Sequence, residues 1–208
     1  MRDLLIAETS EWLVLNKPAG WLSIPGRSPG IPVLLELAQE RWGKLWTVHR
    51  IDLETSGVIL FARSAEAHKL ANSWFQRHQV KKAYDCLAEG APSAPVLRLK
   101  TLVAGAPSTT QVTVLERFSQ GFFARAVPLT GRRHQIRIHL ADAGYPLFGD
   151  STYGGRRIID LAAGPLEVGR TALHASRLEL PSGEIFEAAW PSDFASWLEV
   201  LRGEVVRA

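Results

Sequence analysis

Cysteine and long apolar runs are the first things that this sequence has little of. Cys86 is the single cysteine among 208 residues, which excludes an internal disulfide and favours a reducing compartment. No apolar run approaches the roughly 18 residues that span a bilayer. The first residues, MRDLLIAETSEW, lack the basic start and long apolar stretch of a signal peptide. We therefore expect a cytoplasmic protein with no membrane association.

Motifs for nucleotides and metals are also missing. The sequence has neither a Walker A loop nor a G-x-G-x-x-G motif. His134 and His139 are five positions apart, off the i, i+4 spacing that pairs ligands on a helix, and no cysteine cluster exists. GRSPG (26–30) has the letters of a hydrolase elbow, but Pro29 has no N–H to serve an oxyanion, so Ser28 is a weak nucleophile candidate. The sequence predicts no metal and no cofactor.

The composition is that of an ordinary globular protein. Hydrophobic residues make up 46% and charged residues 22% of the chain, and the length fits one domain over residues 1–208. The net charge of +3 is a weak signal, but between Glu116 and Asp142 there is no acidic residue. That interval contains five arginines and two histidines, which suits a polyanion. A solvated basic face explains the charge alone equally well. The basic residues are Arg117, Arg125, Arg132, Arg133, His134, Arg137 and His139.

Apolar spacing and the placement of glycine and proline predict many strands and few helices. Helices are expected over 33–42, from the cap Ser64 through Phe75, within 130–144 after a turn, and over 193–202. Residues 155–169 are expected to form an irregular loop. The elements do not alternate strictly, so we expect an α+β fold with a mixed, largely antiparallel central sheet flanked by helices. Strands are expected over 12–17, 45–51, 58–62, 80–90, 109–118, 122–127 and as a hairpin within 173–191.

The stretch HRIDLETSG (49–57) raises the question of chemistry. In this stretch Asp52 is a carboxylate shortly before an apolar run. Most aspartates of soluble proteins are solvated or cap a turn. Two further segments also have polar residues at positions where the fold alone would not require them. They are KKAYDCLAEG (81–90) and TGRRHQIRIHLADAGYPLFGDSTYG (130–154). Together they offer a carboxylate, a phenol and several guanidiniums, a set that suits a site around a nucleotide.

These three segments resemble the RluA-type pseudouridine synthase family. HRIDLETSG is similar to its catalytic-aspartate motif, KKAYDCLAEG to its tyrosine segment and the third segment to its arginine motif. WLVLNKPAGWLSIPG (12–26) and TALHASRLELPSG (171–183) resemble its first and last motifs, so the likeness runs in order along nearly the whole chain. The resemblance implies the pseudouridine synthase catalytic fold and an isomerase that modifies RNA.

The resemblance also implies a role for each matching residue. Asp52 would be the essential carboxylate and Arg137 its partner, and a carboxylate beside a cation is favoured in its charged form. Tyr84 would stack on the target uracil and help to move the proton lost from C5. Arg50 would reach toward the gap left by the flipped nucleotide, and Ile136 and Leu173 would line the base. The positions expected to contact RNA or substrate are His49, Arg50, Thr55, Arg132, Arg133, His134, Gln135, Ile136 and Leu173.

The implied reaction breaks the N1–C1′ bond of a uridine in rRNA or tRNA, turns the uracil and joins C5 to C1′. Whether Asp52 adds to C1′ or assists proton removal from the ribose stays open. Leu53 departs from the family, which often has a basic residue there. The first motif begins near residue 12, so we expect the catalytic domain alone, without an S4-type domain, to recognise a structured stem-loop without an obligate protein partner. An RNA-binding module that has lost catalysis is the main alternative.

Overall fold

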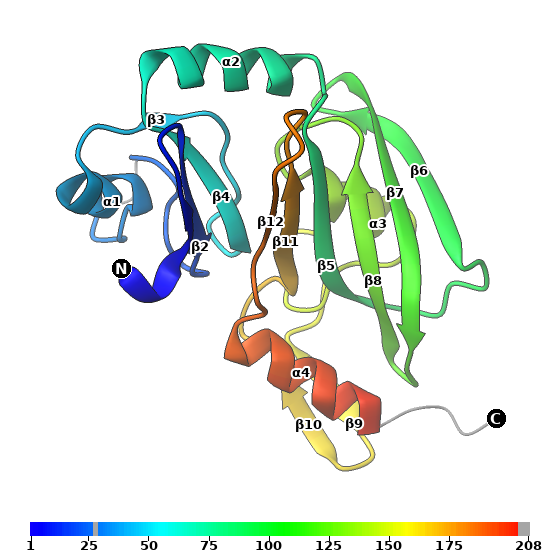
Figure 1. Cartoon of the computed structure of the whole chain (residues 1–208). Coiled ribbons are helices and arrows are strands. Elements are labelled where there is room, and N and C mark those ends of the chain that lie inside the picture. Colours follow the sequence, from blue (N-terminus) through cyan, green and yellow to red (C-terminus); the bar gives the residue numbers. More distant parts are fainter. Residues whose placement is uncertain (27–28, 204–208) are drawn as a thin grey trace. The chain divides into compact units, whose positions relative to one another are not determined.

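The computed structural model describes residues 1–26 and 29–203 (Figure 1). The candidate nucleophile Ser28 lies outside these residues. The chain forms two compact units, which are described separately. The first contains Met1–Lys82 and Ala175–Ala189, and the second contains Ala83–His174 and Trp190–Ala208. The single domain expected over 1–208 stays a prediction. Within residues 1–26 and 29–203, no helix is long and apolar enough to cross a membrane.

The first unit is built on β2 and β4, an antiparallel pair in which Trp12 faces Ala62 and Lys17 faces Gly57. On the far side of β2 lies β1, and β4 also pairs with β3 and neighbours β11, which pairs with β12. The elements are η1 (Arg2–Leu4), β1 (Leu5–Glu8), β2 (Trp12–Lys17), α1 (Leu34–Trp42), β3 (Trp46–Thr47), β4 (Ser56–Ala62), α2 (Ala65–Gln76), β11 (Leu173–Glu179) and β12 (Ile185–Glu187).

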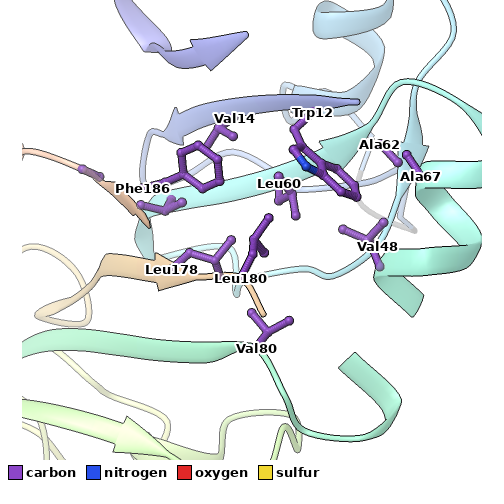
Figure 2. Close-up of a cluster of buried hydrophobic side chains, with 13 residues drawn as sticks. Trp12, Val14, Val48, Leu60, Ala62, Ala67, Val80, Leu178, Leu180 and Phe186 are labelled. Atoms are coloured by element: carbon purple, nitrogen blue, oxygen red, sulfur yellow. The ribbon is translucent and has the colours of Figure 1, made fainter. Parts of the chain in front are cut away.

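Both faces of this sheet are covered, which explains why β4 is apolar along its whole length. Side chains alternate across a strand, so Val58, Leu60 and Ala62 fall in a cluster with Trp12 and the α2 residue Ala67 (Figure 2). The intervening residues of β2 and β4 pack instead with Leu34 and Ala38 of α1. A strand that is buried on both faces reads as a continuous apolar run, and VILFA is that run.

The second unit is an antiparallel sheet in the order β5-β8-β7-β6. Cys86, Ala124 and Val112 lie on the face that packs with α3, and Leu87 and Phe123 lie on the face that packs with α4. The Cys86 thiol is buried, and burial together with the neighbouring Asp85 raises its pKa. The elements are β5 (Lys81–Glu89), β6 (Val96–Val103), β7 (Ala106–Arg117), β8 (Gly121–Pro128), α3 (Gln135–Asp142), β9 (Ile158–Leu161), β10 (Gly164–Glu167) and α4 (Ser192–Gly203).

The predicted α+β class with a largely antiparallel sheet is confirmed. The four expected helices form, and Ser64 caps α2 by accepting a hydrogen bond from the N–H of Ala67 at 3.1 Å. Two expectations about elements are wrong. Residues 155–169 contain the antiparallel hairpin β9–β10, whose Ile159 is buried in the α4 cluster. Strand β3 covers only residues 46–47 of the expected 45–51.

Candidate active site

Asp52 lies in the loop between β3 and β4, and both ends of that loop are tied down. On one side, the Ser23 hydroxyl donates to the carbonyl of Ile51 at 2.8 Å and accepts from its N–H at 3.2 Å. On the other, the N–H of Thr55 donates to the Asp52 carbonyl at 3.2 Å, and the Thr55 side chain is buried. Asp52 itself is half-buried and Arg50 is exposed. A carboxylate is thus presented from an ordered backbone.

Lys17 also holds this loop, through its side chain. Its side chain is fully buried, and its ammonium donates to the carbonyls of Pro18 and Trp21 at 2.8 Å and of Leu53 at 3.2 Å. The N–H of Gly20 donates to the Leu53 carbonyl as well, at 2.9 Å. A buried ammonium requires such acceptors. Because Leu53 is held through its backbone, these contacts do not depend on its departure from the family's basic residue.

His49 is held inside the unit. Its ring stacks on Phe75, with centroids 4.9 Å apart and planes at 17°, and its Nε2 accepts a hydrogen bond from the N–H of Leu60 at 2.9 Å. Burial lowers the pKa of His49 to about 3, and the nearby cation of Lys82 adds to the effect. The neutral ring with Nε2 as acceptor satisfies all of these observations. His49 therefore braces the middle of β4 at Leu60, and an RNA contact from it stays a prediction.

In the second unit, the structure brings Tyr84, Ile136 and Leu173 together. Ile136 and Leu173 are buried members of the cluster between α3 and the sheet, and the partly buried Tyr84 packs against it. These are the three residues expected to surround the base. The ring of Tyr84 and the two aliphatic side chains thus belong to one apolar cluster. Their contact with a uracil stays a prediction.

Arg137 is buried in α3 and forms a bidentate ion pair that the sequence analysis did not predict. Its Nε donates to Oδ2 of Asp150, and its Nη2 donates to Oδ1, both at 2.7 Å. The arginine and aspartate side chains are 7% and 1% exposed. The guanidinium also lies over the ring of Tyr153, with its carbon 5.1 Å from the centroid. Asp150 and Tyr153 lie in the segment that resembles the arginine motif, but the sequence alone does not show that they contact Arg137.

The turn before α3 is held by Gln135. Its Oε1 accepts from the Thr130 hydroxyl at 2.7 Å and from the N–H of Arg132 at 3.1 Å. Its Nε2 donates to the Thr109 carbonyl at 3.0 Å and to the Thr110 hydroxyl at 3.1 Å. Gln135 is buried, whereas Arg132 and the adjacent Arg133 are exposed. The buried amide therefore shapes a turn that presents two cations to solvent.

His134 is the last residue before α3 and is one of three non-glycine residues with positive φ among residues 1–26 and 29–203, at 57°. Its Nδ1 lies 2.9 Å from the Tyr153 hydroxyl, and the two rings meet edge to face at 85°. The half-buried His134 thus contacts the tyrosine that covers Arg137. Its expected contact with RNA stays a prediction.

A family model described as RNA pseudouridylate synthase matches residues 11–142. Ribosomal large subunit pseudouridine synthase C of Vibrio parahaemolyticus is 34% identical over 86% of this chain, and the D enzyme of Pseudomonas aeruginosa is 33% identical over 95%. The chain spans 61% of the length of the first of these proteins and 71% of the second. The chain therefore belongs to the RNA pseudouridylate synthase family.

Solved structures support the fold. A structure titled Human RNA Pseudouridylate Synthase Domain Containing 4 aligns with a TM-score of 0.78, covering 97% of this chain and 94% of its own, at 23% sequence identity. A structure titled Human RNA Pseudouridylate Synthase Domain Containing 1 aligns with a TM-score of 0.72 over 97% of this chain. At these identities the agreement is one of architecture. The pseudouridine synthase catalytic fold expected from the motifs is confirmed.

Proposed function

We propose that this protein is an RNA pseudouridine synthase that isomerises uridine in structured rRNA, with tRNA as the second possible substrate. The observation that carries the proposal is the family match over residues 11–142, which includes the Asp52 loop, Tyr84 and Arg137. Relatives from Vibrio parahaemolyticus and Pseudomonas aeruginosa are named ribosomal large subunit pseudouridine synthases, which favours rRNA. The reaction takes place in the cytoplasm, without a cofactor or an obligate protein partner.

Asp52 is the essential carboxylate in this proposal. Its half-buried position on a braced loop supports that role, because a reacting group must be held in a productive geometry. Arg137 keeps Asp52 ionised, and Tyr84 stacks on the uracil and helps to move the C5 proton. The bond between N1 and C1′ breaks and C5 joins C1′; C5 loses its proton and N1 takes one up, so atoms and electrons balance. Addition to C1′ and assistance in ribose deprotonation are both compatible with one carboxylate.

RNA binding in this proposal is largely electrostatic. The target uridine is extruded from a stem-loop at a cost of roughly a few kcal/mol. Phosphate contacts from exposed cations such as Arg132 and Arg133 offset that cost. Arg50, which is also exposed, enters the gap left by the flipped nucleotide. Ile136 and Leu173 line the apolar side of the base.

Tritium release from large-subunit rRNA transcripts labelled with 5-tritiated uridine tests the activity. The wild-type protein is expected to release tritium, and Asp52→Asn and Asp52→Ala are expected to lose at least a thousandfold in rate while they still bind the RNA. Asp142→Asn, an exposed carboxylate at the end of α3, is the matched control and should keep the wild-type rate. Equal release by the Asp52 variants contradicts the role of Asp52. Tight binding with no release by the wild type favours the binding module.

Mapping pseudouridine in total RNA from cells with and without the gene identifies the target. Loss of one or a few sites in large-subunit rRNA supports the rRNA assignment. Loss confined to tRNA replaces it with the second substrate. Unchanged pseudouridine at every site, together with no tritium release, overturns the proposed activity.

A further inference from the structure

Asp150 determines how the guanidinium of Arg137 is turned. Two parallel hydrogen bonds of 2.7 Å join the Nε–Nη2 edge of Arg137 to the two carboxylate oxygens. A side-on bidentate pair fixes the plane of a guanidinium as well as its distance. With both side chains nearly removed from solvent, water does not compete for these bonds. The Nη1 nitrogen, which is not part of this pair, therefore has a defined direction.

Tyr153 limits how far the guanidinium can move in the direction perpendicular to its own plane. The ring lies 5.1 Å from the guanidinium carbon, within the range of a cation–π contact. Its hydroxyl contacts Nδ1 of His134 at 2.9 Å. His134 directly precedes α3, the helix that carries Arg137. Edge and face of the guanidinium are thus held by two residues of one short segment.

That segment has little freedom to move. The N–H groups of Tyr153 and Gly155 both donate to the Asp150 carbonyl, at 3.1 and 2.8 Å. Gly149, with φ of 76°, passes so close to Arg170 that a Cβ would lie 1.9 Å from its carbonyl oxygen. A Cβ on Gly155 would lie 1.8 Å from the carbonyl oxygen of Leu147. The close packing of the backbone on both sides of Asp150 supports a pre-set carboxylate.

We infer that Asp150 and Tyr153 are positioning residues for the isomerisation, which fix the direction of Arg137 and balance its charge. This inference rests on the proposed function, in which Arg137 acts beside Asp52. Asp150 offsets part of the charge of Arg137 and fixes the direction in which the guanidinium can favour the ionised form of Asp52.

The chain contains a matched control for this arrangement. Arg170 makes a bidentate pair with Asp193, at 2.7 and 3.0 Å, and its guanidinium carbon lies 5.2 Å from the ring centroid of Trp197. Both sets pair a buried arginine with an aspartate and an aromatic ring in similar geometry, but Asp193 is more exposed than Asp150, at 41% against 1%, and this set serves the start of α4. Effects common to both sets report on folding, and effects confined to the Arg137 set report on the reaction.

Single-turnover rates and RNA dissociation constants, measured on the labelled rRNA transcript, test the inference. Asp150→Asn keeps the shape but removes the charge and one hydrogen bond, and its rate constant is expected to fall at least tenfold with the dissociation constant within threefold. Tyr153→Leu should lose a similar factor, and Tyr153→Phe, which keeps the ring over Arg137, should restore the rate to within threefold of wild type. Asp193→Asn should stay within twofold. A rate for Asp150→Asn within twofold of wild type, or an equal loss in Asp193→Asn, overturns the inference.

A second measurement does not require activity. The Nε–H signal of Arg137 in ¹H–¹⁵N spectra, assigned with Arg137→Lys, is expected to be protected from exchange in the wild type. Asp150→Asn should shift it and speed its exchange, Tyr153→Leu should shift it, and Asp193→Asn should leave it unchanged. An unchanged signal in both Asp150→Asn and Tyr153→Leu overturns the inference. If the wild type releases no tritium, the proposed function fails, and this signal still decides whether the two residues position Arg137.

Discussion

The ammonium of Lys17 donates a hydrogen bond to the carbonyl of Leu53, one residue after Asp52 in the chain. The first motif and the aspartate motif are 36 residues apart in sequence at this contact, and a single buried cation joins them. The same cation also binds the carbonyls of Pro18 and Trp21, so its loss affects both segments that meet at this contact. The order of the Asp52 loop therefore depends on a residue that makes no chemical step itself.

Replacing Lys17 by methionine tests this dependence. The side chain keeps its volume but loses three buried hydrogen bonds to carbonyls, so the free energy of unfolding should fall by about 2–3 kcal/mol. Urea unfolding measures the loss. Lys44→Met, at an exposed lysine whose ammonium lies over the ring of Trp46, should change it by less than about 1 kcal/mol. Equal effects of the two substitutions would contradict a special role of Lys17.

Gly57, the last residue of HRIDLETSG, should not tolerate a side chain. Its φ is +117°, and a Cβ there would lie 2.2 Å from the carbonyl oxygen of Ala175 in β11. Gly57→Ala is expected to cost more than about 4 kcal/mol, because backbone of two strands must separate. Gly164 has nearly the same φ, +118°, with nothing within 4 Å, so Gly164→Ala should cost only about 1–2 kcal/mol for the dihedral strain. Thermal or urea unfolding of both variants separates the steric cost from the dihedral one.

His49 should make the stability depend on pH. Its folded-state pKa of about 3 lies below its ordinary value of 6.5, so the unfolded chain takes up a proton that the folded chain does not. Stability is then fully present above pH 6.5 and is lost as the pH falls toward 3. Between pH 6.5 and 5 the wild type should lose about 1–2 kcal/mol that His49→Gln does not lose. Urea unfolding at the two pH values measures this, with the exposed His78→Gln as control; parallel curves for wild type and His49→Gln would show that the ring protonates without cost.

Gln135 should contribute to stability and not only to RNA binding. Gln135→Leu removes four hydrogen bonds from a buried site, and we expect a loss of about 2–3 kcal/mol. RNA binding should weaken as well, because the turn that presents Arg132 loses its anchor. Gln111→Leu, on an exposed position of β7, is the control for both readouts. Weaker RNA binding with unchanged stability would show instead that Gln135 is a direct RNA contact.

The elements that were predictable from sequence are those with a local signal. The cap at Ser64, the apolar face of α2 and the glycine after α1 each act within a few residues, and the structure has all three. The hairpin β9–β10 was missed because its strands are four residues long and because part of their stability comes from tertiary packing, such as that of Ile159 in the α4 cluster. Strand β6 was missed in the same way, since its alternating side chains are mostly exposed.

Among the site residues, too, those with a local signal were predictable and those defined by distant contacts were not. Asp52, Tyr84 and Arg137 could be selected because each lies in a recognisable segment. The partners could not, because the contact between Lys17 and Leu53 closes a loop of 36 residues and the one between Arg137 and Asp150 a loop of 13. The bracing role of Gln135 could not be predicted either: the structure shows a buried side chain that holds the turn, and its expected RNA contact stays a prediction.

The buried thiol of Cys86 has a practical consequence. It is the chain's single cysteine, it lies in the core, and its pKa is raised by burial, so maleimide and iodoacetamide dyes should leave the native protein unmodified. A cysteine introduced at the exposed Arg133 would then carry the whole label. The wild-type sequence is already a background-free starting point for fluorescence or spin-label measurements of RNA docking at the turn before α3.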